Sequence, residues 1–86
     1  VRVCGTKPYH GHALGASGAM EVAISSLVIQ RGWVPPVLNL ETPGEDCDLP
    51  YVRGDGWEGE VRNVLSNSFG FGGINACVAI SRADPA

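Results

Sequence analysis

Residues 12–30 form the longest hydrophobic stretch of the chain, and their spacing predicts a helix. On a helical projection the apolar side chains lie on nearly all sides. Arg31 in the last turn, Gly32 directly after it and the Pro35-Pro36 pair beyond predict where this helix ends. Such a helix needs cover on several sides, which indicates a larger parent domain than 86 residues provide.

Two narrow stripes interrupt the apolar surface of this predicted helix. The polar stripe consists of Ser17, Glu21 and Ser25. The other stripe is made of small residues, Gly11, Gly15, Gly18 and Val22. A glycine inside a helix costs about 1 kcal/mol relative to alanine unless close packing requires it. We therefore expect another stretch of backbone to pack against the small stripe.

Two β-rich runs follow later in the chain, at residues 60–66 and 76–81. The glycine-rich segment between them predicts that they pair as antiparallel neighbours. Residues 1–4 are typical of the end of a strand. Residues 33–60 are rich in proline and turn residues, which predicts an ordered loop with short extended pieces. Residues 82–86 are expected to form a frayed tail.

Composition and charge exclude several classes of protein. The net charge is −3 and the Lys and Arg residues are scattered, so no basic stripe is available for nucleic acid. The longest apolar run is too short and too polar for a membrane span. Three cysteines without CxxC spacing favour a reducing, cytoplasmic setting. The chain begins at Val1 without a signal-like stretch, so we expect it to be cut from a longer protein.

The segment Gly5–His12 is the first candidate for chemistry. It precedes the predicted helix, whose N-terminal N–H groups and dipole favour negative charge. Lys7 and His12 there are suited to stabilising a developing enolate or oxyanion. The alternative is a surface loop with a solvated lysine and incidental histidines. His10 and His12 do not have a recurrent zinc spacing, so no metal is expected.

The second candidate is the segment at residues 67–75, which contains three glycines and two phenylalanines. This composition suits a flexible loop that moves an aromatic side chain over a site. A plain β-turn with a phenylalanine packed into the core is the alternative.

The sequences TKPYHGHALGASGAME (6–21) and NSFGFGGINA (67–76) resemble the closing third of type II elongating β-ketoacyl-acyl-carrier-protein synthases. The proline-rich stretch VPPVLNLETPGEDCDLPYV (34–52) is also similar to that family. The resemblance implies an α/β fold of the thiolase-like αβαβα type. Residues 1–86 would form a partial C-terminal domain, with a buried helix and the closing strands of a mixed sheet. The N-terminal half would be absent.

The resemblance also implies residue roles. His12 would be one of two catalytic histidines that hold the thioester carbonyl and stabilise the enolate. Lys7 would tune the electrostatics of the site, and Glu21 would support the network through hydrogen bonds. Phe71 matches the family's gating phenylalanine. Its hinges would be Gly70, Gly72 and Gly73.

This chain departs from the family pattern at two positions and lacks one catalytic group. His10 stands where a threonine is usual, and Ile74 stands where threonine is common. The family's nucleophilic cysteine comes from an earlier part of the chain and is absent here. Cys4 ends a β-prone stub and Cys77 lies in an apolar strand, so both are expected to be small buried hydrophobes rather than nucleophiles.

The implied reaction is acyl transfer to cysteine followed by decarboxylative Claisen condensation with malonyl-acyl carrier protein, in fatty acid synthesis. The implied partner is acyl carrier protein, whose phosphopantetheine carries the substrate, and the parent is expected to be a homodimer. No cofactor is implied, and the fragment alone is expected to be inactive. Two alternatives stay open. One is the ketosynthase of a polyketide synthase, and the other is a non-catalytic partner subunit resembling a chain-length factor.

Overall fold

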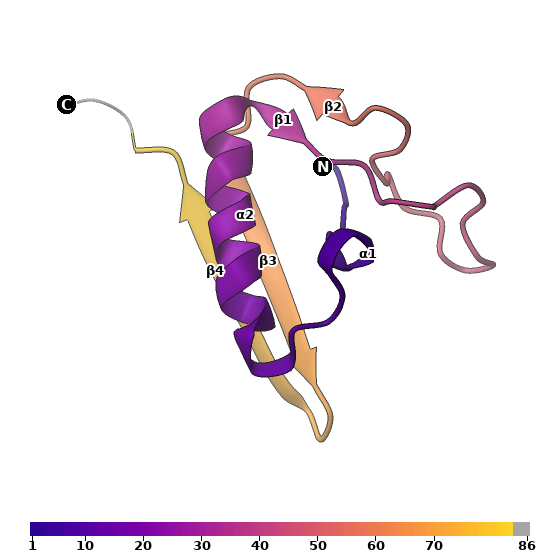
Figure 1. The fold of residues 1–86 in the computed structure, drawn as a ribbon, viewed down its shortest axis with the longest axis vertical. Helices are drawn as coiled ribbons and strands as arrows, with labels where there is room; N and C mark the ends of the chain where they lie inside the picture. The colour runs from indigo at the N-terminus through magenta and orange to yellow at the C-terminus, as the bar shows by residue number, and fades with distance from the viewer. Residues whose placement is uncertain (84–86) are drawn as a thin grey trace.

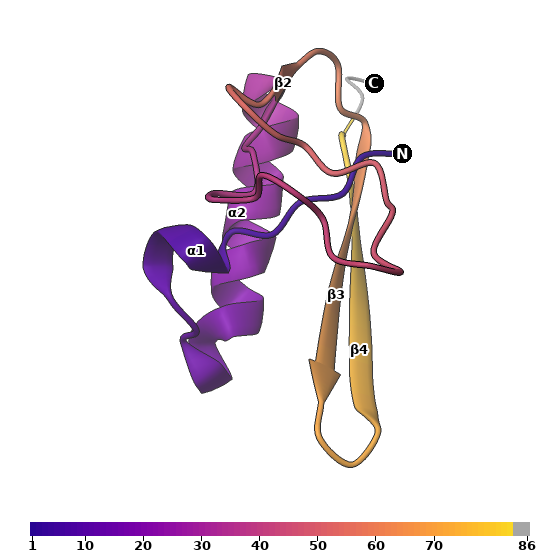
Figure 2. The ribbon, with the colours of Figure 1, turned by 90° about the vertical axis from the view of Figure 1, so that its right-hand side faces the viewer.

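The computed structural model describes residues 1–83, and residues 84–86 of the expected tail lie outside the described part. In chain order the elements are α1 (Lys7–His10), the 3₁₀ turn η1 (Leu14–Ala16), α2 (Ser17–Arg31), β1 (Trp33–Val34), β2 (Trp57–Glu58), β3 (Asn63–Gly70) and β4 (Ile74–Ser81). Helix α2 lies across one face of the β3–β4 hairpin (Figure 1), and α1 lies on the side of α2 away from the hairpin (Figure 2). The chain is therefore an α/β structure.

Helix α2 ends where the sequence predicts. Gly32 has a left-handed φ of 64°, and its N–H donates to the Val28 carbonyl at 2.9 Å. The predicted start at residue 12 is wrong, because α2 begins at Ser17 after the 3₁₀ turn. Leu14 has a φ of 51° and donates its N–H to the His12 side chain. A left-handed backbone at a non-glycine residue cannot belong to a right-handed α-helix, so α2 begins only after Leu14.

The predicted antiparallel hairpin is confirmed. Strands β3 and β4 pair from Asn63 with Ser81 at the open end to Gly70 with Ile74 at the turn. The turn residues are Phe71, Gly72 and Gly73, and both glycines have positive φ, at 86° and 83°. Glycine fits these positions because it has no Cβ to clash in this backbone conformation.

The two faces of the hairpin differ in cover. Val64, Ser66 and Ser68 are half-buried on the face toward α2, whereas Leu65 and Phe69 alternate with them and are 65% and 79% exposed. Exposed apolar residues on one sheet face mean that the described part of the chain covers only the other face of the hairpin.

The polar stripe of α2 turned out to lie on the covered side of the helix. Ser17 and Ser25 are buried, and Glu21 is half-buried. Leu27 on an apolar side is about half exposed. A Cβ added at Gly15 or Gly18 would meet no atom of residues 1–83 within 4 Å, so the expected backbone neighbour is not found in the described chain.

The N-terminal residues and the proline-rich stretch form a small core beside α2. Val3 makes a parallel bridge with Tyr51, and Val52 donates its N–H to the Val3 carbonyl at 2.9 Å. Val34 and Val52 are the buried hydrophobic residues. The prediction of a loop with short extended pieces at 33–60 is confirmed, by β1 and β2, whereas residues 1–4 form an isolated bridge at Val3 and no strand. None of the helices in residues 1–83 has the length and apolarity that crossing a bilayer requires.

Candidate functional site

An ion pair joins α1 to α2. Lys7 Nζ donates to Glu21 Oε1 at 2.6 Å, with 43% and 20% of the two side chains exposed. The structure thus brings together two of the residues singled out from the sequence, fourteen positions apart. At this exposure water screens the charges, and such a pair contributes about 1 kcal/mol at most. Its main consequence is to fix α1 against the covered side of α2.

His12 is held at its Nδ1 atom by two groups. The backbone N–H of Leu14 donates to Nδ1 at 3.0 Å, and the Ser17 hydroxyl lies 3.2 Å from the same nitrogen. A backbone N–H can only donate, so Nδ1 is unprotonated and the neutral ring carries its proton on Nε2. His12 is exposed, and Nε2 has no hydrogen-bond partner within residues 1–83. The ring therefore offers an N–H donor to a ligand.

The predicted anion site differs in detail from a simple helix N-terminus. Lys7 belongs to α1, a helix of four residues, and His12 lies in the loop before η1. The start of α2 reaches His12 through the Ser17 hydroxyl rather than through backbone N–H groups. Stabilisation of negative charge at this site therefore rests on the imidazole N–H and on the lysine.

Sequence reasoning missed three residues that hold the site. Leu14 and Ser17 contact His12, and Tyr9 donates its hydroxyl to the Pro36 carbonyl at 2.7 Å, which ties α1 to the proline-rich stretch. A serine five residues after the histidine, at the start of the helix, is a signal that could have revealed Ser17. No local pattern indicates a bond between residues as distant as Tyr9 and Pro36.

His10 points its ring nitrogens at its own segment and not at His12. Its Nδ1 lies 2.8 Å from the Gly11 carbonyl, and its Nε2 lies 3.0 Å from Thr6 Oγ1. Within residues 1–83 there is no cluster of three side chains that could hold a metal ion. His10, which stands where a threonine is usual in the family, therefore stabilises the loop around α1 through these two contacts.

The turn at residues 70–73, called the GFGG turn below, lies at the same end of the molecule as the start of α2 (Figures 1 and 2). Phe71 is fully exposed at the tip, and Phe69 is largely exposed on β3. The alternative of a phenylalanine packed into the core is therefore wrong for this chain. Ile74 is also exposed, opposite Gly70 in the register. Residues 1–83 do not bring Phe71 into contact with Lys7 or His12.

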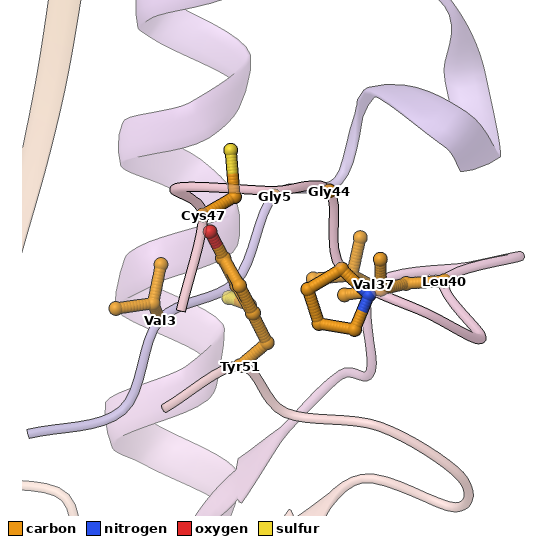
Figure 3. Close-up of a pocket in the computed structure, with 9 residues that line it drawn as sticks. Val3, Gly5, Val37, Leu40, Gly44, Cys47 and Tyr51 are labelled. Atoms are coloured by element: carbon orange, nitrogen blue, oxygen red, sulfur yellow. The ribbon is translucent and has the colours of Figure 1, made fainter. Parts of the chain in front are cut away.

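All three cysteines are exposed, so the expectation of buried thiols is wrong for this chain. Cys4 and Cys47 line an open, apolar pocket of about 370 Å³ between the N-terminal residues and the proline-rich stretch (Figure 3). Desolvation by the surrounding atoms raises the pKa of the Cys4 thiol above its ordinary value of 9.0. A raised pKa disfavours the thiolate, which argues against Cys4 as a nucleophile.

Several known proteins are similar to this chain over nearly all of its length. Residues 1–41 match the family model described as Beta-ketoacyl synthase, C-terminal domain. The chain is 49% identical to 3-oxoacyl-(acyl-carrier-protein) synthase 2 of Coxiella burnetii, over 93% of this chain and 19% of that protein. It is 44% identical to the synthase of the same name from Synechocystis, over 95% of this chain and 20% of that protein.

A polyketide relative is similar to a comparable degree. The granaticin polyketide putative beta-ketoacyl synthase 1 of Streptomyces violaceoruber is 42% identical, over 100% of this chain and 20% of that protein. The chain thus spans about a fifth of the length of the curated relatives it matches. It belongs to the β-ketoacyl synthase family and corresponds to the C-terminal part of its members.

Proposed function

We propose that the complete protein containing this chain is a β-ketoacyl-acyl-carrier-protein synthase that extends acyl chains in fatty acid synthesis. Its reaction would be the decarboxylative Claisen condensation of an acyl thioester with malonyl-acyl carrier protein. The two 3-oxoacyl synthases of similar sequence support this assignment. Because the chain spans so small a share of those relatives, the remaining catalytic groups are assigned to the rest of the protein.

The observation that carries the proposal is the state of the His12 ring. With Nδ1 accepting from Leu14, the Nε2–H is available to donate to the oxygen of a thioester. When the malonyl group loses carbon dioxide, the electron pair of the broken C–C bond is delocalised onto this oxygen as an enolate. An N–H aimed at the developing charge stabilises it without needing a proton transfer. The enolate carbon then attacks the acyl thioester carbonyl, and the cysteine thiolate leaves.

Lys7 and Glu21 would act on the same site from α1 and α2. Their 2.6 Å contact supports a role in holding the Lys7 cation and the loop that leads to His12 in fixed positions. The Lys7 charge would favour the anionic malonyl group and the enolate, and the Glu21 carboxylate limits how far the lysine side chain moves.

Phe71 would gate the acyl site, with Gly70, Gly72 and Gly73 as hinges. The positive φ of Gly72 and Gly73 and the full exposure of Phe71 support a turn that reaches beyond this chain toward the rest of the protein. The nucleophilic cysteine would also come from there. None of Cys4, Cys47 or Cys77 begins a helix of the described chain, where a thiolate is commonly stabilised.

The complete fold would be the thiolase-like αβαβα type, with residues 1–86 as part of its C-terminal domain. A groove of about 850 Å³ is lined by the N-terminal residues 1–6 and by residues 60–67, which include the start of β3. On that side β3 has no paired strand within residues 1–83. A strand edge facing an apolar groove supports a sheet that continues through further strands of the complete protein.

The proposed partner is an acyl carrier protein with a phosphopantetheine arm, and the complete protein would be a cytoplasmic homodimer. No cofactor or metal is assigned. A polyketide ketosynthase with the same chemistry is the second candidate, because the granaticin relative is nearly as similar as the 3-oxoacyl synthases. A non-catalytic partner subunit is less well supported, since both Lys7 and His12 are retained and positioned.

The test is to incubate the complete protein with malonyl-acyl carrier protein and an acyl-loaded carrier protein, and to analyse the carrier-bound products by mass spectrometry. A β-ketoacyl product two carbons longer than the primer is expected. Release of carbon dioxide without chain extension would indicate that the condensing step is missing. No turnover of malonyl-carrier protein in either step would contradict the proposed function and favour the non-catalytic subunit.

A further inference from the structure

Ser17 differs from the other serines of α2 in the group that its hydroxyl contacts. Ser25 Oγ donates to the Glu21 carbonyl at 2.7 Å, and Ser26 Oγ donates to the Val22 carbonyl at 3.0 Å. Both are bonds to the helix's own backbone four residues earlier, which is the common arrangement for a serine within a helix. The Ser17 hydroxyl instead lies 3.2 Å from His12 Nδ1, outside the helix.

Helix capping does not explain the position of Ser17. The N-cap residue of α2 is Ala16, and no side chain caps this end of the helix. Ser17 is only 8% exposed, so its hydroxyl needs a partner inside the protein. His12 Nδ1 is the side-chain partner found for it within residues 1–83.

The two groups that contact His12 Nδ1 constrain the ring in different ways. The Leu14 N–H excludes a proton from Nδ1 but leaves the ring free to tilt about that single bond. A second donor from α2 fixes the ring plane relative to a rigid helix, and the ring plane determines where the Nε2–H points.

We propose that Ser17 is a positioning residue for His12: its hydroxyl donates to Nδ1 and aims the Nε2–H at the thioester oxygen. The proposal rests on the proposed function of His12. Ser17 itself touches no substrate. It acts on the transition state, in which the oxygen becomes charged, more than on substrate binding, so its removal should lower kcat and leave KM unchanged.

The test compares three variants of the complete protein in malonyl-carrier decarboxylation. Ser17→Ala should lower kcat about fivefold at unchanged KM, the factor typical for loss of one neutral hydrogen bond. Ser17→Thr keeps the hydroxyl and should restore the rate. Ser25→Ala removes an equally buried hydroxyl that contacts only the helix backbone, and it should leave kcat unchanged. In protein labelled with ¹⁵N-histidine, the His12 Nδ1 resonance should shift in Ser17→Ala and not in Ser25→Ala.

Unchanged kcat and an unchanged Nδ1 resonance in Ser17→Ala would overturn the proposal, as would equal losses in Ser17→Ala and Ser25→Ala. The failure of the proposed function has a different signature. In that case His12→Ala would decarboxylate at the normal rate, while the Nδ1 resonance would still report whether Ser17 holds the ring.

Discussion

The two motifs that resemble the β-ketoacyl synthases differ in how much of their geometry this chain determines. In residues 6–21 the motif fixes its own side chains, because Lys7 pairs with Glu21 and His12 contacts the Leu14 N–H and the Ser17 hydroxyl. The GFGG turn has a defined backbone, but Phe71 at its tip is fully exposed. The first motif therefore carries its own positioning groups, whereas the second depends on neighbours from elsewhere in the complete protein.

The largest effect is expected at His12, the residue of the first motif that is proposed to contact the substrate. His12→Ala in the complete protein should slow malonyl-carrier decarboxylation about 10²- to 10³-fold, as removal of one oxyanion donor does in other enzymes. His12→Gln keeps an N–H donor near the place of Nε2 and should lose less. Carbon dioxide release from malonyl-acyl carrier protein measures both. A normal rate in His12→Ala would remove His12 from the mechanism.

Alanine substitutions at two glycines with similar backbone conformation test how tightly the end of α2 and the GFGG turn are packed. A Cβ at Gly32 would lie 2.7 Å from the Gly59 carbonyl oxygen, whereas a Cβ at Gly72 would meet no atom of residues 1–83 within 4 Å. Gly32→Ala should cost about 2 kcal/mol or more in the free energy of unfolding, and Gly72→Ala about 1 kcal/mol from its positive φ alone. Urea unfolding of the complete protein measures both. A larger cost at Gly72 would mean that the rest of the complete protein packs against the turn, whereas a cost well below about 2 kcal/mol at Gly32 would contradict the close packing against Gly59.

Phe71 is expected to affect the rate of acyl transfer to the enzyme and not the rate of malonyl decarboxylation. Phe71→Ala should change the rate of acyl transfer to the enzyme roughly tenfold, corresponding to an aromatic contact of about 1–1.5 kcal/mol, with little change in malonyl decarboxylation. Phe69→Ala, two residues away on β3, is the matched control. Single-turnover acyl transfer followed by mass spectrometry separates the two steps. Unchanged loading in Phe71→Ala would rule out the gate.

The smallest effect is expected from the charge pair of the first motif. A double-mutant cycle with Lys7→Met and Glu21→Gln should give a coupling energy of about 0.5–1 kcal/mol in urea unfolding. Added salt should reduce this coupling because both side chains reach solvent. A coupling of zero at low salt would mean that the pair does not hold α1 against α2.

The sequence was informative wherever the deciding interactions are local. Gly32 predicted the end of α2, and the β-rich runs around the GFGG segment predicted the hairpin, because caps and turns depend on a few neighbouring residues. The start of α2 was missed because Leu14 has a left-handed backbone conformation, in which its N–H donates to the His12 side chain. Pattern analysis counts apolar positions and cannot detect such a local backbone conformation.

The site was predictable in its residues but not in its contacts. Lys7, His12 and Glu21 were identified through resemblance, and their arrangement follows from the fold around α1. The burial of the polar stripe and the exposure of the cysteines were not predictable. Both depend on which surfaces the rest of the protein covers, and the periodicity of one helix or strand holds no information about that.

The central claim is that this chain holds the His12 ring with its proton on Nε2. The direct measurement is the ¹⁵N spectrum of the complete protein labelled with ¹⁵N-histidine, with the His12 signals assigned from their loss in His12→Ala. The account predicts an unprotonated Nδ1 that accepts hydrogen bonds and a protonated Nε2. A proton on Nδ1 of the neutral ring would contradict the Leu14 contact and, with it, the role proposed for His12.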